Sequence, residues 1–267
     1  MAKYIEIAVE KGFADYIRKF WLLDNSANPL ISYGKYALPN GCVTIAFISG
    51  NGTMIDFEKH TVKVKPGIYF IGQISTKVAV SLEPYTKAIM VQLNPWTPSL
   101  ITKYPFYELT NNVISLADIN KDLYSALLNV NLSDEQLLLS KLYQELKYYL
   151  TWSSDFSLLR MVFNELSVDP LKPQVKIPEI ARKSRYSPRL IEQKFNHFVG
   201  LSPKEMQRIL QLRSLIDDLV PNHKTSLSAL AYKHGYFDQS HFIKSYRKIM
   251  LDQPKRFNAN QYILPLY

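Results

Sequence analysis

The sequence predicts an α+β protein, in which a β-barrel-like N-terminal domain precedes an all-α domain of two helix-turn-helix units joined by a long helix. Short apolar runs separated by turn residues fill about the first 115 residues, which is typical of strands. Apolar residues then recur at helical spacing from about residue 116, and an internal repeat follows. We therefore expect a β-rich domain over 1–115, a helical dimerisation or linker segment over 116–169, and a further domain over 170–267.

Turn signals separate the apolar runs of the β-rich part. Residues 43–48 precede Gly50-Asn51-Gly52, which is a hairpin turn signal. Residues 61–65 alternate polar and apolar side chains before a Pro-Gly turn, and residues 68–71 form another apolar run. Several short strands at this spacing indicate a barrel or a sandwich.

Two helices are predicted in the middle segment. Ser133 is the expected N-cap of the first, because the acidic residues Asp134 and Glu135 follow it in the first turn. A second helix is expected over 156–166. The apolar stripe of the first helix marks either a core face or a dimerisation face: Leu138, Leu139, Leu142, Tyr143, Leu146, Tyr149 and Leu150.

Two prolines and a change in charge mark a domain boundary at about 167–175. Pro170 and Pro173 each disfavour helix just before them. Residues 1–170 hold 15 Lys and Arg against 16 Asp and Glu, a net charge of −1, whereas residues 171–267 hold 17 against 7, a net charge of +10, so the second part carries all of the excess in the total of +9. This asymmetry predicts a polyanionic partner for the second part, although a basic surface that only faces solvent fits the same counts.

The composition excludes several other classes of protein. No run approaches the roughly 18 apolar residues of a membrane helix, and no signal peptide is present, so we expect a cytoplasmic protein without membrane contact. The single cysteine, Cys42, allows no internal disulfide and fits a small buried hydrophobe better than a nucleophile. Residues 1–170 contain one histidine, His60, so we expect no metal, no cofactor and no catalytic residues.

The last part of the chain contains two copies of one pattern. Residues 177–195 and 227–246 align at an offset of 50 to 51 residues. Ala181 and Ala231 occupy the middle of each predicted first helix, where a second helix has to cross closely. Gly235 follows four residues after Ala231, where a tight turn requires positive φ.

A second helix is expected after each turn. Ser187 and Asp238 are suitable N-caps, and the inward positions are four apart: Ile191 with Phe195, and Phe242 with Tyr246. A short helix, a tight turn and a second helix make a helix-turn-helix, whose second helix enters the major groove of DNA. Ser202 is the expected N-cap of a connecting helix over 203–219. This helix would hold two recognition helices roughly 34 Å apart, so that they enter successive grooves.

These residues resemble the AraC/XylS family of transcription regulators. The segment 235–248 followed by Pro254 is similar to the family signature, and 186–188 with 200–203 is similar to its first unit. The resemblance implies control of transcription through double-stranded promoter DNA and contact with RNA polymerase. It also points to an activator, although the sequence alone does not separate activation from repression.

Two positions depart from the family pattern. Arg185 stands in the first turn where the family usually has glycine, and Leu251 replaces the glycine before Asp252. A left-handed arginine would cost roughly 1 kcal/mol. We therefore expect the first turn to be reshaped and the final loop to differ.

Outward positions of the recognition helices are the expected base readers. They are Arg189 and Gln193 in the first unit, and Gln239, Ser240, His241 and Lys244 in the second. Arginine suits guanine and glutamine suits adenine, because each forms two parallel hydrogen bonds with that base. The expected phosphate contacts, which position the protein without reading sequence, are Arg182, Lys194, Arg247, Lys248, Lys255 and Arg256. A solvated side chain is the alternative at each position.

The β-rich part resembles the cupin-like sensor domain of some AraC-type regulators, through 38–47, 70–73 and 91–96. The resemblance implies that this domain binds a small-molecule effector or mediates formation of a homodimer. The candidate residues of an effector pocket are Tyr69, Phe70, Gln73, Gln92 and Trp96. A barrel filled by its own side chains fits these residues equally well.

We therefore expect a sequence-specific DNA-binding transcription regulator whose DNA-binding domain spans 170–267. One alternative is a cupin-like ligand-binding or enzyme domain fused to a DNA-binding domain, against which the lack of a histidine cluster argues. Another is a non-specific architectural DNA binder. The polar, hydrogen-bonding residues at 189, 193, 239 and 241 argue against that alternative.

Overall fold

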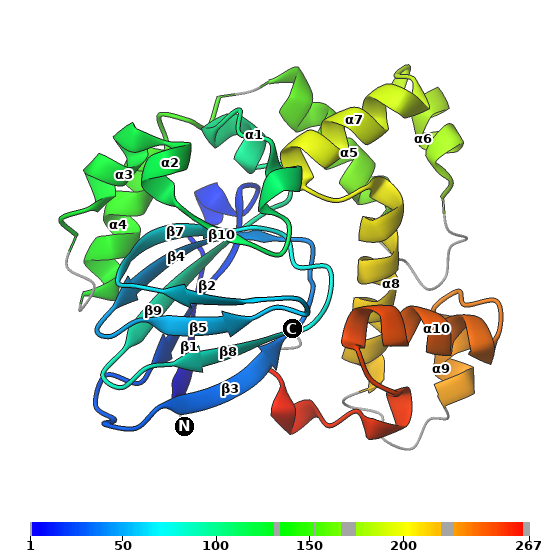
Figure 1. The fold of residues 1–267 in the computed structure, drawn as a ribbon. Helices are drawn as coiled ribbons and strands as arrows, with labels where there is room; N and C mark the ends of the chain where they lie inside the picture. The colour runs from blue at the N-terminus through cyan, green and yellow to red at the C-terminus, as the bar shows by residue number, and fades with distance from the viewer. Residues whose placement is uncertain (1, 131–133, 152, 167–174, 220–226, 264–267) are drawn as a thin grey trace.

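The computed structural model describes residues 2–130, 134–151, 153–166, 175–219 and 227–263. Two β-sheets lie face to face, helices cover the outer face of the larger sheet, and a group of helices stands beside the sheets (Figure 1). This is the α+β architecture that the sequence predicts, with a barrel-like pair of sheets in the N-terminal part.

All strand pairs in the two sheets are antiparallel. The six-stranded sheet has the order β1 (Lys3–Ile7), β2 (Ile17–Asp24), β9 (Lys87–Leu93), β4 (Val43–Ser49), β7 (Gly67–Ile71) and β10 (Val113–Ser115). The four-stranded sheet has the order β3 (Ser32–Ala37), β8 (Val78–Leu82), β5 (Thr53–Asp56) and β6 (Thr61–Val64). Apolar side chains of both sheets, among them Trp21, Met90, Ile55 and Val80, fill the space between them.

The turn at residues 50–52 connects the two sheets, and the prediction that it closes a hairpin is wrong. Strands β4 and β5 flank this turn, but β4 pairs with β7 and β9 whereas β5 pairs with β6 and β8. Gly50 and Gly52 both have positive φ, and a Cβ atom there would collide with the carbonyl oxygens of Tyr85 and Val64. The two glycines are therefore needed where the chain crosses between sheets.

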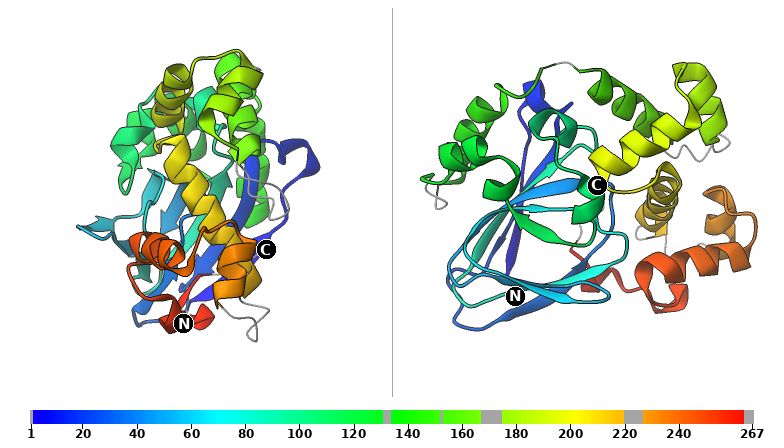
Figure 2. Two further views of the ribbon diagram at one scale, coloured as in Figure 1. Left: turned by 90° about the vertical axis from the view of Figure 1, so that its right-hand side faces the viewer. Right: turned by 45° about the horizontal axis from the view of Figure 1, so that its top comes forward.

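Helices α2 (Leu116–Ile119), α3 (Lys121–Leu127) and α4 (Glu135–Leu146) cover the outer face of the six-stranded sheet (Figures 1 and 2). The apolar stripe of α4 is buried there, so it is a core face and not a free dimerisation face. The N-cap of α4 is Asp134, whose side chain accepts from the backbone N–H of Leu137 at 2.9 Å. The predicted N-cap, Ser133, lies outside the described residues, and the cap is one residue later than expected.

The remaining helices form the group that stands beside the sheets (Figure 1). They are α1 (Pro98–Ile101), α5 (Ser154–Leu166), α6 (Ile177–Ser184), α7 (Pro188–Val199), α8 (Pro203–Leu219), α9 (Leu227–Lys233) and α10 (Gln239–Met250). Short 3-10 turns occur at Lys11–Phe13, Phe106–Leu109, Pro254–Arg256 and Ala259–Gln261. The predicted boundary at 167–175 lies almost entirely outside the described residues.

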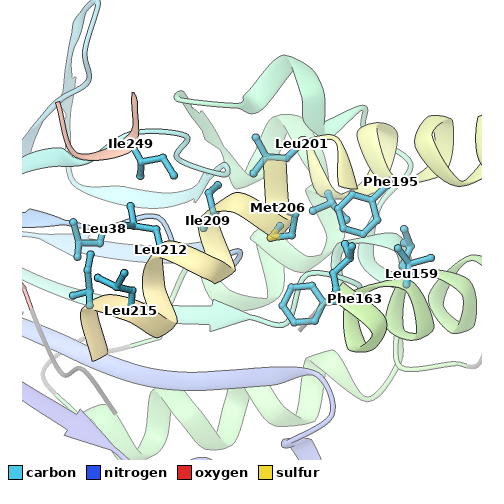
Figure 3. Close-up of a cluster of buried hydrophobic side chains, with 14 of the residues drawn as sticks. Leu38, Leu159, Phe163, Phe195, Leu201, Met206, Ile209, Leu212, Leu215 and Ile249 are labelled. Atoms are coloured by element: carbon cyan, nitrogen blue, oxygen red, sulfur yellow. The ribbon is translucent and has the colours of Figure 1, made fainter. Parts of the chain in front are cut away.

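Helix α5 packs with the C-terminal helices, whereas α2, α3 and α4 pack on the sheet. Phe163 and Leu159 of α5 lie beside Phe195 of α7 and Met206 of α8 in one apolar cluster (Figure 3). The helical segment predicted over 116–169 is therefore divided between two cores.

The same cluster extends into the β-domain. Leu38, which follows β3, faces α8 (Figure 3). Trp96, in the loop after β9, packs edge-on against Phe163 of α5, with the two ring centroids 5.4 Å apart. The C-terminal residues add a second joint, because Tyr262 pairs with Tyr36 of β3 in a parallel bridge. The N-terminal and C-terminal parts thus share one continuous apolar core.

Two residues other than glycine adopt the left-handed conformation at equivalent places in the repeat. Arg185 ends α6 with φ of 61°, as Gly235 ends the equivalent turn after α9 with φ of 74°. Leu251 ends α10 with φ of 53°, as Gly200 ends α7 with φ of 88°. The expectation that Arg185 and Leu251 reshape their turns is therefore wrong, because the backbone keeps the geometry at a cost of roughly 1 kcal/mol per residue.

Replacing Leu251 with glycine should stabilise the protein. Leu251→Gly removes the left-handed strain, and because 41% of the side chain is already exposed, the loss of packing offsets only part of this gain. We expect the free energy of unfolding to rise by about 0.5–1 kcal/mol in denaturant titrations. Gly200→Ala is the matched control and should destabilise, because its Cβ would lie 2.7 Å from the Phe106 carbonyl oxygen. An unchanged or lower stability of Leu251→Gly would contradict the strain argument.

Candidate nucleic-acid interface

The two repeat copies fold as two helix-turn-helix units, α6 with α7 and α9 with α10. Ala181 and Ala231 are buried where the paired helices cross. The Ser187 side chain caps α7 by accepting from the Leu190 N–H at 3.2 Å, and Asp238 caps α10 by accepting from the His241 N–H at 2.7 Å. Both predicted N-caps are confirmed.

The inward and outward faces of the recognition helices are as predicted. The inward positions Ile191, Phe195, Phe242 and Tyr246 are buried. The six predicted base readers are all exposed: Arg189, Gln193, Gln239, Ser240, His241 and Lys244. Each recognition helix therefore presents a polar face that is free of the core.

The predicted phosphate contacts fall into two groups. Arg182, Arg247, Lys248, Lys255 and Arg256 have exposed side chains, and Arg256 also lies 3.6 Å from Asp252. Lys194 is different, because its Nζ lies 3.0 Å from Asp155 and over the Phe198 ring. The Lys194 ammonium therefore holds α7 against α5 in this arrangement.

Helix α8 fixes the two units relative to each other. Its 17 residues span about 25 Å at 1.5 Å per residue, with one unit at either end. Ser202 and Glu205 start the helix with reciprocal hydrogen bonds, in which Ser202 Oγ accepts from Glu205 N–H and Glu205 Oε2 accepts from Ser202 N–H at 2.9 Å. The predicted N-cap at Ser202 and the long connecting helix are both confirmed.

The second unit is anchored to the end of α8 by Asp218. Its Oδ2 accepts from Lys233 Nζ at 2.6 Å and lies 2.9 Å from Nε2 of His234, which is buried. The other ring nitrogen of His234 lies 3.1 Å from Ser214 Oγ. The Lys233 hydrogen bond is the main cause that holds the pKa of Asp218 below its ordinary value, with desolvation opposing it.

The β-domain faces the recognition helix α10. The backbone N–H of Lys77 donates to the carbonyl oxygen of Ile249, near the C-terminal end of α10, at 2.8 Å. His241 and Lys244 line a cleft of about 760 Å³, whose other side includes Ser75 and Thr76 of the β-domain. The face of α10 that carries the predicted base readers is thus partly turned toward the N-terminal part.

The predicted effector residues are distributed over several places. Gln92 of β9 lines a cavity of about 70 Å³ between the two sheets. Gln73 is buried and donates to the Gly41 carbonyl oxygen at 2.8 Å, while Tyr69 packs partly buried on the apolar cluster between the sheets. Phe70 is buried on the opposite face, beneath the helices, and Trp96 donates to the Asp15 carbonyl oxygen at 2.7 Å.

The described residues contain no group of three or more side chains that could hold a metal ion. His60 stacks on Phe57 with ring centroids 5.0 Å apart. Cys42 is buried, and desolvation raises the pKa of its thiol, as fits a packed apolar residue. Within the described parts of the chain, none of the helices combines the length and the apolar character that a membrane-spanning helix requires.

Sequence reasoning missed three side chains near α10. Phe237, in the turn before α10, is 88% exposed, and Tyr232 of α9 is 81% exposed. Arg208 of α8 lines the cleft beside α10, although it lies outside both helix-turn-helix units. The sequence could have pointed to Phe237, because it is an apolar residue in an otherwise polar turn. It could not have pointed to Arg208, because the position of that residue beside α10 depends on tertiary packing.

Residues 180–260 match the family model of a helix-turn-helix domain, and residues 6–115 match a model described as a domain of unknown function (DUF6597). No curated protein matches the sequence. ToxT from Vibrio cholerae is similar in structure with a TM-score of 0.44 and 12% identity over 95% of this chain and 96% of that chain. The structure of ToxT bound to an unsaturated fatty acid is similar with a TM-score of 0.42 and 12% identity, over 83% of this chain and 88% of that chain. The structure of the AraC-like transcriptional activator CuxR is similar with a TM-score of 0.28 and 11% identity, over 87% of this chain and 90% of that chain.

Asp218→Asn should reduce the stability of the fold at neutral pH. It should also remove the part of that stability that depends on ionised Asp218 and is lost in acid. Because the pKa of Asp218 is lowered on folding, its contribution is present above the ordinary pKa of about 3.9 and is lost as the pH falls through the lower folded value. Asp217→Asn is the matched control, since desolvation raises the pKa of Asp217 despite its contact with Arg213. Urea titrations between pH 7 and pH 3 measure both. Equal pH profiles for Asp218→Asn and the native chain would contradict the assigned role.

Proposed function

We propose that this chain, whose residues 180–260 match a helix-turn-helix domain, is a sequence-specific transcription regulator of the AraC type that places α7 and α10 in adjacent major grooves of DNA. One observation carries the proposal. The two recognition helices lie at opposite ends of α8, their apolar faces are buried, and their predicted base-reading side chains are exposed. Two recognition helices held in this way fit a DNA site whose two halves lie about one helical turn apart.

The proposed DNA contacts are of two kinds, contacts to base edges and contacts to phosphates. Arg189 suits a guanine, Gln193 and Gln239 suit adenines, and the remaining readers are Ser240, His241 and Lys244. The exposed basic residues Arg182, Arg247, Lys248, Lys255 and Arg256 are proposed to contact phosphates, which adds affinity without adding specificity. Lys194 would join them only after leaving Asp155.

The wider role follows from the family resemblance. We propose that the protein acts in the cytoplasm as a transcriptional activator without catalytic activity of its own, and that it contacts RNA polymerase when bound to a promoter. A homodimer is compatible with this role. The apolar stripe of α4 is not available for such a contact, because it is buried on the six-stranded sheet.

The proposed effector site is the cavity between the sheets. Its lining is mostly apolar and includes Trp21, Ile55 and Met90. Gln92 also lines a neighbouring small cavity that is bounded by Lys19 of β2 and Arg213 of α8. An apolar body with an acidic group fits this arrangement, because the body would lie between the sheets and the acid would face the two cations.

This site would connect effector binding to the DNA-binding domain. Lys19 lies 3.4 Å from Glu6, and Arg213 lies 3.1 Å from Asp217, so an acidic effector would replace partners that these cations already have. A cavity of about 70 Å³ is also far smaller than the roughly 300 Å³ of a usual ligand site, so binding has to move the walls. Since Arg213 belongs to α8, such a movement reaches both helix-turn-helix units.

Selection from a random duplex library with the full chain tests DNA recognition. We expect an asymmetric site with two half-elements about one helical turn apart. Arg189→Ala should relax the base preference in one half and Gln239→Ala in the other, each at a cost of about 1–3 kcal/mol against the native site. The full chain is used because α5 is part of the C-terminal core.

Lys255→Ala is the matched control for these two variants. It should weaken binding to all sequences alike and reduce the salt dependence, because a phosphate contact carries no sequence information. Enrichment of no sequence by the native chain would contradict the proposed function. A loss of base preference in the Lys255→Ala variant would contradict the assignment of Lys255 as a phosphate contact.

Oleate and its uncharged methyl ester test the effector site. We expect oleate to quench the fluorescence of Trp21, which lines the cavity, and to change DNA affinity, whereas methyl oleate should bind at least tenfold more weakly. Arg213→Gln should remove the difference between the two ligands. Equal binding of both ligands to the native chain would show that the cations do not recognise an acid.

A further inference from the structure

A cleft lies between the β-domain and the second helix-turn-helix unit, and it includes residues of α10 that are proposed above to contact DNA. We define the interdomain cleft as the space of about 760 Å³ lined by side chains from three places. The β-domain contributes Ser75 and Thr76, α8 contributes Arg208, and α10 contributes Lys244, Arg247 and Lys248. Its size lies within the usual range for small-molecule sites.

The interdomain cleft carries an excess of positive charge. Arg208, Lys244, Arg247 and Lys248 have no ion pair with any other residue that the structure describes. Four cations concentrated between protein walls repel one another more strongly than on an open surface, because less water screens them. A bound anion would relieve this repulsion.

The two acidic residues of the cleft do not balance these cations. Glu205 Oε2 already accepts hydrogen bonds from the backbone N–H and the hydroxyl of Ser202, at 2.9 and 2.7 Å. Desolvation opposes ionisation of Glu205, but the Ser202 hydrogen bonds and the charges of Lys248 and Arg208 together lower its pKa. Glu205 and Glu58 are therefore two negative charges against four positive ones, which leaves the lining of the cleft with an excess of positive charge.

The β-domain wall of the cleft offers the hydroxyl groups of Ser75 and Thr76, and that of Ser75 is held in place. Ser75 Oγ accepts from Asn111 Nδ2 at 2.8 Å, and Ser75 N–H donates to Asn111 Oδ1 at 2.8 Å. The hydroxyl hydrogen of Ser75 therefore remains available to donate to a ligand. The Lys77 N–H to Ile249 carbonyl hydrogen bond fixes this wall against α10.

We propose that the interdomain cleft binds a small phosphate-bearing ligand, of about the size of a nucleotide, between these hydroxyls and the cations. Arginine and lysine beside hydroxyl donors are the groups that recognise phosphate in proteins. The regulatory consequence rests on the proposed function, because Lys244, Arg247 and Lys248 cannot hold this ligand and contact DNA at the same time. The ligand would keep the β-domain attached to α10 and would weaken DNA binding.

Calorimetry with ATP and with inorganic pyrophosphate, at constant ionic strength, tests the site directly. We expect ATP to bind the native chain, and we expect the Arg208→Gln substitution to weaken the affinity for ATP at least tenfold. Thr76→Val, on the opposite wall and of nearly unchanged shape, should also weaken it. Arg189→Gln is the matched control, since it removes the same charge from α7 outside the cleft, and should leave ATP binding unchanged. Tight binding of pyrophosphate alone would show that the phosphates supply the recognition.

DNA competition provides the second measurement. Saturating ATP should weaken binding of the native chain to duplex DNA at least tenfold, and should have little effect on Arg208→Gln. The proposal is overturned if no probe binds the native chain. It is also overturned if Arg208→Gln and Thr76→Val, both shown to be folded by thermal melting, bind ATP as the native chain does. Because calorimetry uses no DNA, failure of the proposed DNA recognition would leave its result unaffected.

Discussion

Burial of helix α8 on both of its sides is the interaction on which the rest of the structure depends. Met206 packs toward α5 and α7, while Leu212 and Leu215 lie toward Leu38 of the β-domain (Figure 3). The approach is so close at one point that a Cβ atom on Gly41 would lie 2.8 Å from the Met206 sulfur. One helix therefore joins the two DNA-binding units and also joins them to the sheets. Because packed cores are dense, a shift of α8 at one contact has to be accommodated at the others.

The sequence allowed prediction of the features that depend on local periodicity and capping. Two helix-turn-helix units, helix caps at Ser187, Ser202 and Asp238, and exposed outward faces on α7 and α10 all follow from residues close together in the chain. The turn at residues 50–52 was correctly located, but its strands pair elsewhere, because strand pairing is decided by contacts between distant segments. The tolerance of left-handed backbone at Arg185 was missed for a similar reason, since the packed unit imposes that geometry.

The candidate sites beyond the recognition helices were less predictable. Gln92 was among the predicted effector residues and lines a cavity, but Lys19 and Arg213 meet near it only after α8 docks on the sheets. The interdomain cleft was equally hidden, because its walls come from β-domain loops, α8 and α10. Residue type indicated which side chains could bind anions, whereas their assembly into one cleft required the tertiary structure.

The packing of α5 determines which fragment of this protein will remain soluble. A fragment that starts at residue 170, as the charge pattern alone would suggest, leaves Leu159 and Phe163 behind and uncovers the apolar surfaces of α7 and α8 on which they lie. Uncovered apolar patches of this kind promote aggregation. A fragment that starts near Ser153, whose hydroxyl accepts from the Phe156 N–H, keeps α5 with its cap. The unit suitable for expression is therefore set by apolar packing and begins before the change in charge.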